Sequence, residues 1–225
     1  MIITIDGPAG SGKSTAARML ARRLKIAYLD TGATYRAATL AAIQAGADLR
    51  DPAALAQLVG RLEIGLHYRG DDLAVTVGPQ DVTREIRLPE VSDKSHYLAR
   101  APAVRAVLVD LQRRMGLKLA AEYGGVVSEG RDQGSVVFPQ ADFKFYLDAT
   151  PEVRARRRCD QLLADGQQAD YQEVLQAILL RDGRDRSRSV APLIKPPGGV
   201  EIDTSGMTIA QVTDELARLV QAARP

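Results

Sequence analysis

A glycine-rich segment near the start of the chain has the residue types and spacing that bind nucleotide phosphates. Gly7 and Gly12 are separated by four residues, and Lys13 and Ser14 follow directly. Glycines allow backbone N–H groups to turn toward phosphate oxygens, and a lysine can reach the β and γ phosphates. A serine hydroxyl can ligate Mg²⁺. We therefore predict a nucleoside triphosphate with Mg²⁺ at Gly7, Pro8, Ala9, Gly10, Ser11, Gly12, Lys13, Ser14 and Thr15.

Arginines near the end of the chain indicate a second anion site. Arg181, Arg184, Asp185 and Arg188 follow one another in steps of three, one and three, so one face of a helix carries all four. Three guanidinium groups around one carboxylate repel one another unless an anion lies opposite. The alternative is a solvated face on which the Asp and Arg side chains pair with each other.

Charged side chains also follow the apolar run at residues 126–127, which is typical of a buried strand. Ligands bind at the carboxyl ends of strands in open α/β sheets. Arg131 suits a phosphate there, and Asp132 suits a hydrogen-bond donor. Glu129 is a candidate to hold Mg²⁺ through a water. The alternative for all three is a structural ion pair that caps a loop.

Four further arginines are candidates for phosphate contacts. Arg36 can hold a phosphate bidentately, which a lysine cannot do, or it is a surface arginine. Arg154, Arg157 and Arg158 share a helical face, and the looser residues 164–168 follow them. That arrangement predicts either a lid that closes over the nucleotide or a plain solvated helix.

A sheet with helices between its strands is needed to bring these side chains to one site. Runs of β-forming residues alternate with helical patterns, which predicts a parallel sheet covered on both faces. Residues 63–91 instead alternate around residues 69–72 like a hairpin, which predicts a β-rich insertion. Strands are expected at residues 2–5, 26–29, 126–127, 143–147 and 200–203. Helices are expected at 33–62 with a break near Gly46, at 92–119, from 150 with a Thr N-cap, and from 208, where Thr208 with Gln211 makes a capping box.

The sequence resembles the bacterial cytidylate kinases, within the nucleoside monophosphate kinase group. The matching segments occur in the family's order and span nearly the whole chain, so together they are far more specific than the glycine-rich segment alone. They are residues 3–8 (ITIDGP), 30–36 (DTGATYR), 129–139 (EGRDQGSVVFP), 181–188 (RDGRDRSR) and 191–193 (APL).

The resemblance implies an α/β fold: a three-layer P-loop core with a parallel sheet, in a single domain of 225 residues. An acceptor-binding lobe at about residues 31–105 and a short lid at about 154–188 are expected as insertions. The 63–91 segment looks like the extended acceptor-binding lobe of that family.

The resemblance also implies roles for individual residues. Arg188 would contact the transferring phosphate, and Arg181 with Asp185 would hold the acceptor ribose. Thr31 and Arg105 would contact CMP, Arg105 at the cytosine ring.

Two positions depart from the family's pattern. At position 129 the family more often has Asp. Where the family usually has a serine that contacts the base, this chain has His96, with Ser95 beside it.

The expected reaction is transfer of a phosphoryl group from ATP to CMP, and to dCMP as well, with Lys13, Arg131 and Arg188 stabilising the moving group. One alternative is a P-loop kinase of another small acceptor, such as UMP, shikimate or dephospho-CoA. Another is a non-catalytic nucleotide-binding regulator, although a pure binder needs no second phosphate clamp.

Bulk properties agree with a small-molecule enzyme. The formal net charge of +2 does not call for nucleic acid or an anionic membrane. The single cysteine excludes a disulfide framework within one chain. The first residues begin a strand at once, and no apolar run is long enough to cross a bilayer. We expect a cytoplasmic monomer with no nucleic-acid or membrane partner.

Overall fold

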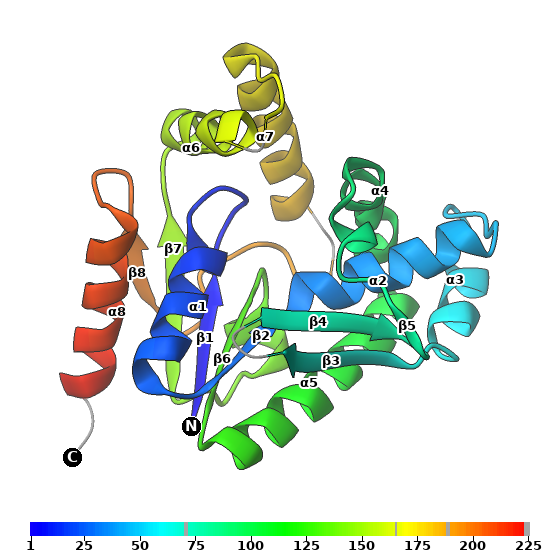
Figure 1. Ribbon diagram of the computed structural model, residues 1–225, viewed down its shortest axis with the longest axis horizontal. Helices are drawn as coiled ribbons and strands as arrows, with labels where there is room; N and C mark the ends of the chain where they lie inside the picture. The colour runs from blue at the N-terminus through cyan, green and yellow to red at the C-terminus, as the bar shows by residue number, and fades with distance from the viewer. Residues whose placement is uncertain (70–71, 165, 188–189, 223–225) are drawn as a thin grey trace. The chain divides into compact units, whose positions relative to one another are not determined.

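The central sheet of the computed structural model has five strands in the order β2-β6-β1-β7-β8 (Figure 1). β1 (Ile2–Asp6) pairs in parallel with β6 (Val126–Gly130) and β7 (Phe143–Asp148), and β7 pairs in parallel with β8 (Val200–Asp203). β2 (Ala27–Asp30) lies beside β6. This confirms the predicted α/β fold with a parallel sheet. The structure describes residues 1–69, 72–164, 166–187 and 190–222.

The chain divides into two compact units, one formed by Met1–Leu29 with Lys118–Pro225 and the other by Asp30–Leu117. The first unit holds most of the central sheet. All five residues of β6 are buried, as expected for a parallel strand that is covered on both faces. Its helical elements are α1 (Lys13–Leu24), a π-helical turn (Gln133–Val137), α6 (Pro151–Ala164), α7 (Tyr171–Arg186) and α8 (Ile209–Ala222).

The helix starts in the first unit follow local sequence signals. Thr208 and Gln211 form the predicted capping box: the Thr208 N–H donates to Gln211 Oε1 at 2.8 Å, and the Gln211 N–H donates to Thr208 Oγ1. At α6 the N–H of Val153 donates to Thr150 Oγ1, with Pro151 as the first helical residue. Both predicted helix starts are confirmed.

The second unit has its own small antiparallel sheet. β3 (Ile64–Arg69) pairs with β4 (Asp72–Val77), which confirms the predicted strands of the hairpin, and β4 pairs with β5 (Gln80–Asp81). Residues 70–71, at the centre of the predicted turn, lie outside the described residues. The helical elements are α2 (Thr31–Gln44), α3 (Pro52–Val59), a 3₁₀ turn (Glu85–Arg87), α4 (Pro89–Arg100) and α5 (Pro102–Tyr123), the last of which continues into the first unit.

The prediction of one helical segment over residues 92–119 is wrong in one respect, because two helices occupy this part of the chain. Ala101 has an extended backbone between α4 and α5, and Pro102 follows it. Proline disfavours the helical conformation in the residue before it, which explains the break. Pro102 was the signal in the sequence that identifies this boundary.

A continuous apolar core holds the second unit together. Leu55 of α3, Leu98 of α4 and Leu108 of α5 are completely buried in it. Val75 of β4 is also buried there, so the core joins the small sheet to the helices. The helices and the small sheet therefore depend on the same buried side chains.

Leu108→Ala tests this core against a matched position on the same helix. Removing a fully buried leucine should lower the free energy of unfolding by about 2–5 kcal/mol, since it removes apolar contacts and leaves a cavity. Leu117 is 58% exposed, so Leu117→Ala should change the free energy of unfolding by no more than about 0.5 kcal/mol. Urea unfolding measures both, and equal effects would contradict this description of the core.

Candidate active site

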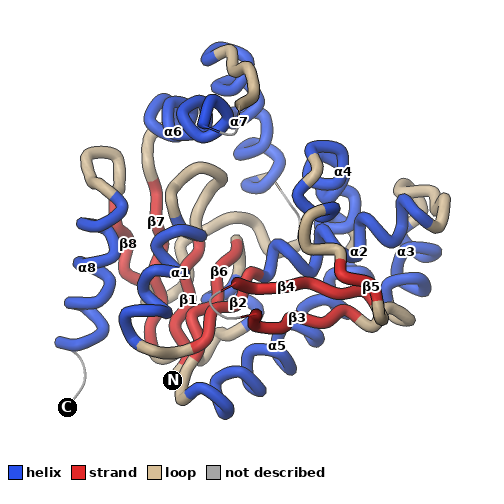
Figure 2. The backbone as a smooth tube through the Cα atoms, in the orientation of Figure 1, coloured by secondary structure: helices blue, strands red, loops and turns tan. Residues whose placement is uncertain are grey.

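Two loops of the first unit begin at neighbouring points on the sheet. Asp6, the last residue of β1, pairs in register with Gly130, the last residue of β6. The glycine-rich segment follows β1 and the Arg131–Asp132 segment follows β6 (Figure 2). Parallel pairing therefore places the predicted phosphate loop and the predicted acceptor residues side by side at the carboxyl ends of the strands.

The phosphate loop closely approaches the strand beside it. A Cβ atom at position 7 would lie 2.1 Å from the carbonyl oxygen of Leu147, so this position requires glycine. Lys13 begins α1 and is buried, and its Nζ donates to the Pro8 carbonyl at 3.3 Å. The ammonium group therefore lies within the curve of the loop, next to the helix N-terminus. Both features favour a bound anion.

Ser14, in the first turn of α1, contacts Glu129, near the end of β6. The Ser14 hydroxyl donates to Glu129 Oε1 at 2.8 Å, and the Tyr28 hydroxyl donates to the same oxygen at 3.3 Å. Within the described residues no group of three or more His, Cys, Asp or Glu side chains could hold a metal ion. One hydroxyl and one carboxylate still suit Mg²⁺, which keeps several waters and takes its other ligands from substrate phosphates.

The Arg131 guanidinium is oriented by a carboxylate of α7. Its Nε donates to Asp185 Oδ2 at 3.2 Å, and its Nη1 donates to the Gly130 carbonyl at 3.3 Å. Asp132 and Asp185 are both buried, whereas Arg181 is exposed. The structure therefore brings together Arg131 and Asp185, two of the predicted acceptor residues. Arg188 lies outside the described residues.

Arg154 is buried, with 1% of its side chain exposed. Its guanidinium forms a two-point ion pair with Asp182 of α7, with N–O distances of 3.1 and 2.5 Å. It also donates to the carbonyls of Ala9, in the phosphate loop, and Ala149. Sequence reasoning did not identify Asp182, because an aspartate among arginines is ordinary on a solvated helix. Arg154 thus links α6 and α7 to the backbone of the phosphate loop.

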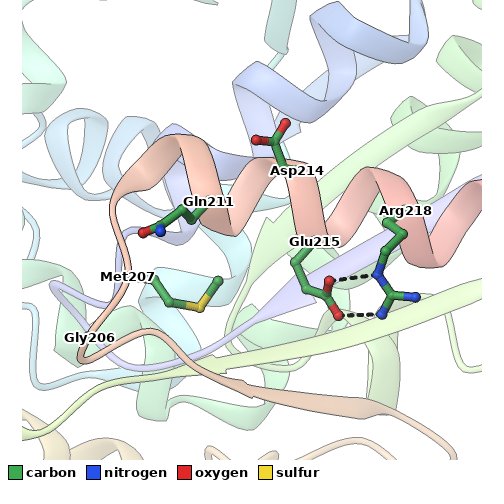
Figure 3. Close-up of a pocket in the computed structure, with 6 residues that line it drawn as sticks. All are labelled: Gly206, Met207, Gln211, Asp214, Glu215 and Arg218. Carbon is green, nitrogen blue, oxygen red and sulfur yellow. Dashed lines mark hydrogen bonds and ion pairs between the residues drawn. The ribbon is translucent and has the colours of Figure 1, made fainter.

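Arg157 contacts the loop between β8 and α8. Its guanidinium donates to Thr204 Oγ1 at 3.1 Å and to the carbonyls of Thr204 and Met207. The Thr204 hydroxyl in turn donates to the carbonyls of Ser11 and Asp148, so this loop is tied to the phosphate loop. Met207 also lines a shallow surface hollow beside α8, where Figure 3 shows the ion pair between Arg218 and Glu215.

In the second unit, Asp30 arranges the start of α2. Its Oδ1 accepts the N–H of Ala33, and its Oδ2 accepts from Arg36 Nη2 at 2.9 Å. A Cβ atom at position 32 would lie 2.8 Å from Arg36 Nη1, so Gly32 leaves the room that the guanidinium occupies. Arg36 is therefore held in one orientation by its own helix N-terminus.

α5 supports the same part of α2. Arg105 is buried and its Nη1 donates to the Tyr35 hydroxyl at 3.2 Å. Gln112, also buried, donates through Nε2 to Thr34 Oγ1 at 2.8 Å and to the Thr31 carbonyl. Gln112 was missed by the sequence analysis, and only its seven-residue spacing from Arg105 indicated that both lie on one face of the helix.

Ser95 and His96 both bond to their own helix. The Ser95 hydroxyl donates to the Ser92 carbonyl at 2.7 Å, and His96 Nδ1 lies 2.6 Å from the Asp93 carbonyl. The His96 ring packs against Tyr97, with 4.1 Å between ring centroids. These hydrogen bonds do not distinguish Ser95 from His96 as the residue that would contact the base.

Asp6 is the buried acid that the motif-based analysis did not single out. It is completely buried at the end of β1, and its two carboxylate oxygens accept the N–H groups of Gln133 and Gly134 at 2.7 and 2.8 Å. Burial raises the pKa of Asp6 to about 7, although the two N–H groups and Arg131 act in the opposite direction. A carboxylate at the end of an apolar strand was the signal available in the sequence.

The chain is similar to known proteins over nearly its whole length. The family model for cytidylate kinase matches residues 3–222. The chain is 44% identical over 223 residues to a cytidylate kinase of Pelotomaculum thermopropionicum, covering 99% of this chain and 96% of the relative. It is 45% identical over 221 residues to a cytidylate kinase of Mycobacterium leprae, covering 98% and 96%.

A solved structure of an uncharacterized protein from Eubacterium ventriosum has a similar fold, with a TM-score of 0.54 at 13% identity. The match covers 100% of this chain and 99% of that one. In the part of the chain that the structure describes, no helix is long and apolar enough to cross a membrane.

Arg154→Met tests the buried ion pair against an exposed one. The substitution leaves the Asp182 carboxylate buried without its countercharge, so the free energy of unfolding should fall by about 3–5 kcal/mol. Arg218→Met breaks the exposed pair with Glu215 and should leave the unfolding midpoint nearly unchanged. Chemical denaturation compares the two variants, and similar midpoints would show that the Arg154 pair contributes little.

The buried Asp6 predicts a pH dependence of stability. Because its folded-state pKa of about 7 exceeds the unfolded value, the folded protein retains a proton that the unfolded chain releases. Its contribution is complete below about pH 4 and is lost as the pH rises through 7. Between pH 5 and pH 8 the parent should therefore lose about 2–3 kcal/mol of unfolding free energy relative to Asp6→Asn, which does not titrate. Urea unfolding of both proteins at the two pH values measures the difference, and a pH-independent difference would contradict the raised pKa.

Proposed function

Because this chain belongs to the cytidylate kinase family and phosphorylates CMP with ATP, we propose that the adjacent ends of β1 and β6 form its reaction centre. The observation that carries the proposal is the register of Asp6 with Gly130. Because of this register, the phosphate loop and the Arg131–Asp132 segment begin at the ends of neighbouring strands. A donor phosphate and an acceptor phosphate must meet in line, and adjacent loops allow this.

On the donor side, ATP binds to residues 7–15. The Ser11 hydroxyl supports this proposal, because it is buried and has no hydrogen-bond partner within the described residues, so a phosphate oxygen would satisfy it. Lys13 neutralises charge at the β and γ phosphates. Arg157 contributes to ATP binding from the lid, which spans about residues 154–188. Arg154 contributes through its bond to the Ala9 carbonyl.

Ser14 and Glu129 would hold Mg²⁺, the serine directly and the glutamate through a water. When bound, Mg²⁺ supplies positive charge to the β and γ phosphate oxygens. The hydrogen bond between Ser14 and Glu129 supports this assignment, because it already places the two groups together.

On the acceptor side, Arg131 contacts the CMP phosphate and Asp132 accepts a hydrogen bond from the cytosine amine. Arg181 and Asp185 contact the ribose, and Arg188 contacts the transferring group. In the lobe at about residues 31–105, the CMP contacts are Thr31, Arg36 and Arg105. The fixed orientation of Arg36 by Asp30 supports its role as a bidentate phosphate ligand.

The chemical step needs positioning rather than a base. An oxygen of the CMP phosphate attacks the γ phosphorus of ATP, and the bond from that phosphorus to the β–γ bridging oxygen breaks, releasing ADP. A phosphate oxygen is already nucleophilic, so no side chain has to remove a proton. Lys13, Arg131 and Arg188 stabilise the transferring group. We further propose that dCMP is accepted and that the enzyme is a cytoplasmic monomer.

Asp132→Asn tests the proposed reading of the base. A carboxylate can only accept, so it pairs with the C4 amine of cytosine and opposes the C4 carbonyl of uracil. Asparagine adds a donor at nearly the same volume. The ratio of kcat/KM for CMP to that for UMP should fall by about tenfold or more, since an unpaired buried polar group costs on the order of 1–3 kcal/mol.

Steady-state kinetics with both acceptors measures this ratio, and ATP affinity and thermal unfolding verify that Asp132→Asn is intact. Asp142→Asn is the matched control, because the Asp142 carboxylate accepts an exposed hydrogen bond from the Ile2 N–H. An unchanged ratio in a folded Asp132→Asn protein would assign base selection to other residues, with Arg105 and the Ser95–His96 pair next to be tested.

A further inference from the structure

Asp6 connects the two loops that the proposed reaction uses. It is the last residue of β1 and directly precedes Gly7, where the phosphate loop begins. Its Oδ1 accepts the Gln133 N–H at 2.7 Å and its Oδ2 accepts the Gly134 N–H at 2.8 Å. These residues follow Arg131 and Asp132 directly. One buried carboxylate therefore joins the start of one loop to the backbone of the other.

The two N–H groups belong to the first turn of the π-helical segment Gln133–Val137. N–H groups in the first turn of a helix have no partner within the helix, and burying them without a partner is costly. Asp132 occupies the N-cap position but makes no side-chain capping hydrogen bond. Asp6, at the end of β1, caps this turn instead, although it lies 127 residues away from Gln133 in the sequence.

Close packing restricts the same segment. A Cβ atom at position 134 would lie 2.8 Å from Thr4 Oγ1 and 3.0 Å from Pro196, so only glycine brings the Gly134 N–H this near to β1. The Gln133 side chain is fixed as well, because its Oε1 accepts from the Ser128 hydroxyl at 2.8 Å. The segment is therefore held through its backbone by Asp6 and through one side chain by Ser128.

We propose that Asp6 is a positioning residue for the acceptor: it sets Arg131 and Asp132 relative to the phosphate loop by capping the turn that follows them. The proposal rests on the proposed contacts of Arg131 and Asp132 with CMP. A purely structural carboxylate would support both substrates equally, whereas a positioning carboxylate affects the acceptor more than ATP.

The chemistry of the site explains why the residue is an aspartate. Only a carboxylate presents two acceptor oxygens to two N–H groups, whereas asparagine turns a donor toward one of them. Burial makes this charge costly to maintain, since it raises the pKa of Asp6. The charged groups that act on it are Asp132, which raises the pKa, and Arg131, which lowers it.

Asp6→Asn compared with Asp142→Asn tests the proposal. Asp142 accepts the Ile2 N–H at 2.6 Å at the other end of β1. Each variant therefore removes a carboxylate that accepts a backbone N–H at one end of that strand. In Asp6→Asn, kcat/KM for CMP should fall by about 10²-fold, as expected when binding groups shift by about 1 Å. Calorimetric affinity for a non-hydrolysable ATP analogue should stay close to that of the parent. Asp142→Asn should leave both quantities unchanged.

Hydrogen exchange provides a readout that does not depend on activity. In Asp6→Asn, amides in the peptide that spans residues 131–137 should exchange faster, while those of α8 should not. Ser128→Ala is a milder second variant that loosens the same segment, and it should show a smaller shift in the same direction in both exchange and KM for CMP.

Three results overturn the proposal: unchanged kcat/KM for CMP in a folded Asp6→Asn protein, an equal loss of ATP-analogue affinity, or unchanged exchange at residues 131–137. Should Asp6→Asn not fold, unchanged exchange and unchanged KM for CMP in Ser128→Ala also overturn it. Asp132→Asn distinguishes failure of the proposed base contact from failure of the positioning role of Asp6. If CMP kinetics also survive Asp132→Asn, the proposed base contact fails; if they do not, only the positioning role of Asp6 fails.

Discussion

The parallel pairing of β1 with β6 is the constraint on which the rest of the first unit depends. The hydrogen-bonded register that aligns Asp6 with Gly130 ends both strands at the same level of the sheet. Two loops that are distant in sequence therefore leave the sheet side by side. Neither loop determines this alone, because their residues are mainly glycines and small or polar side chains, which supply little apolar core. The buried, apolar strands supply the rigid base.

Around these strand ends the protein buries several charged groups in defined partnerships. Arg154 pairs with Asp182, Arg131 with Asp185, and the Asp6 carboxylate accepts two N–H groups. Buried ion pairs are weak evidence for stability, because the cost of desolvation offsets most of the attraction. Their benefit is geometric. Each fixes the direction of a group near the phosphate loop, and pre-organised charge is what phosphoryl transfer requires.

The sequence predicted those parts of the molecule that local patterns determine. The strands along the chain, the glycine-rich turn between β1 and α1, and the capping box of Thr208 with Gln211 all depend on residues within a few positions of one another. The break at Ala101 was also a local signal, since Pro102 follows it, but the helical pattern on both sides obscured it.

Long-range partnerships could not be predicted in this way. The burial of Arg154 depends on Asp182, 28 residues further along, and that of Asp6 depends on amides 127 and 128 residues away. Arginines at helical spacing on α6 are equally compatible with solvent and with a lid, and the structure shows that Arg154 and Arg157 contact backbone carbonyls of loops instead of extending into water. The direction of a side chain follows from tertiary packing, which spacing alone does not encode.

We infer that this geometry transfers a phosphoryl group from ATP preferentially to CMP. A coupled assay of ADP release, run in parallel with CMP, dCMP, UMP, AMP and shikimate at equal concentrations, tests it most directly. We expect the highest kcat/KM for CMP, followed by dCMP, with UMP lower by a large factor. For AMP and shikimate we expect no turnover above the rate without acceptor. A higher kcat/KM for shikimate or AMP than for CMP, or ADP release that does not depend on any acceptor, would contradict it.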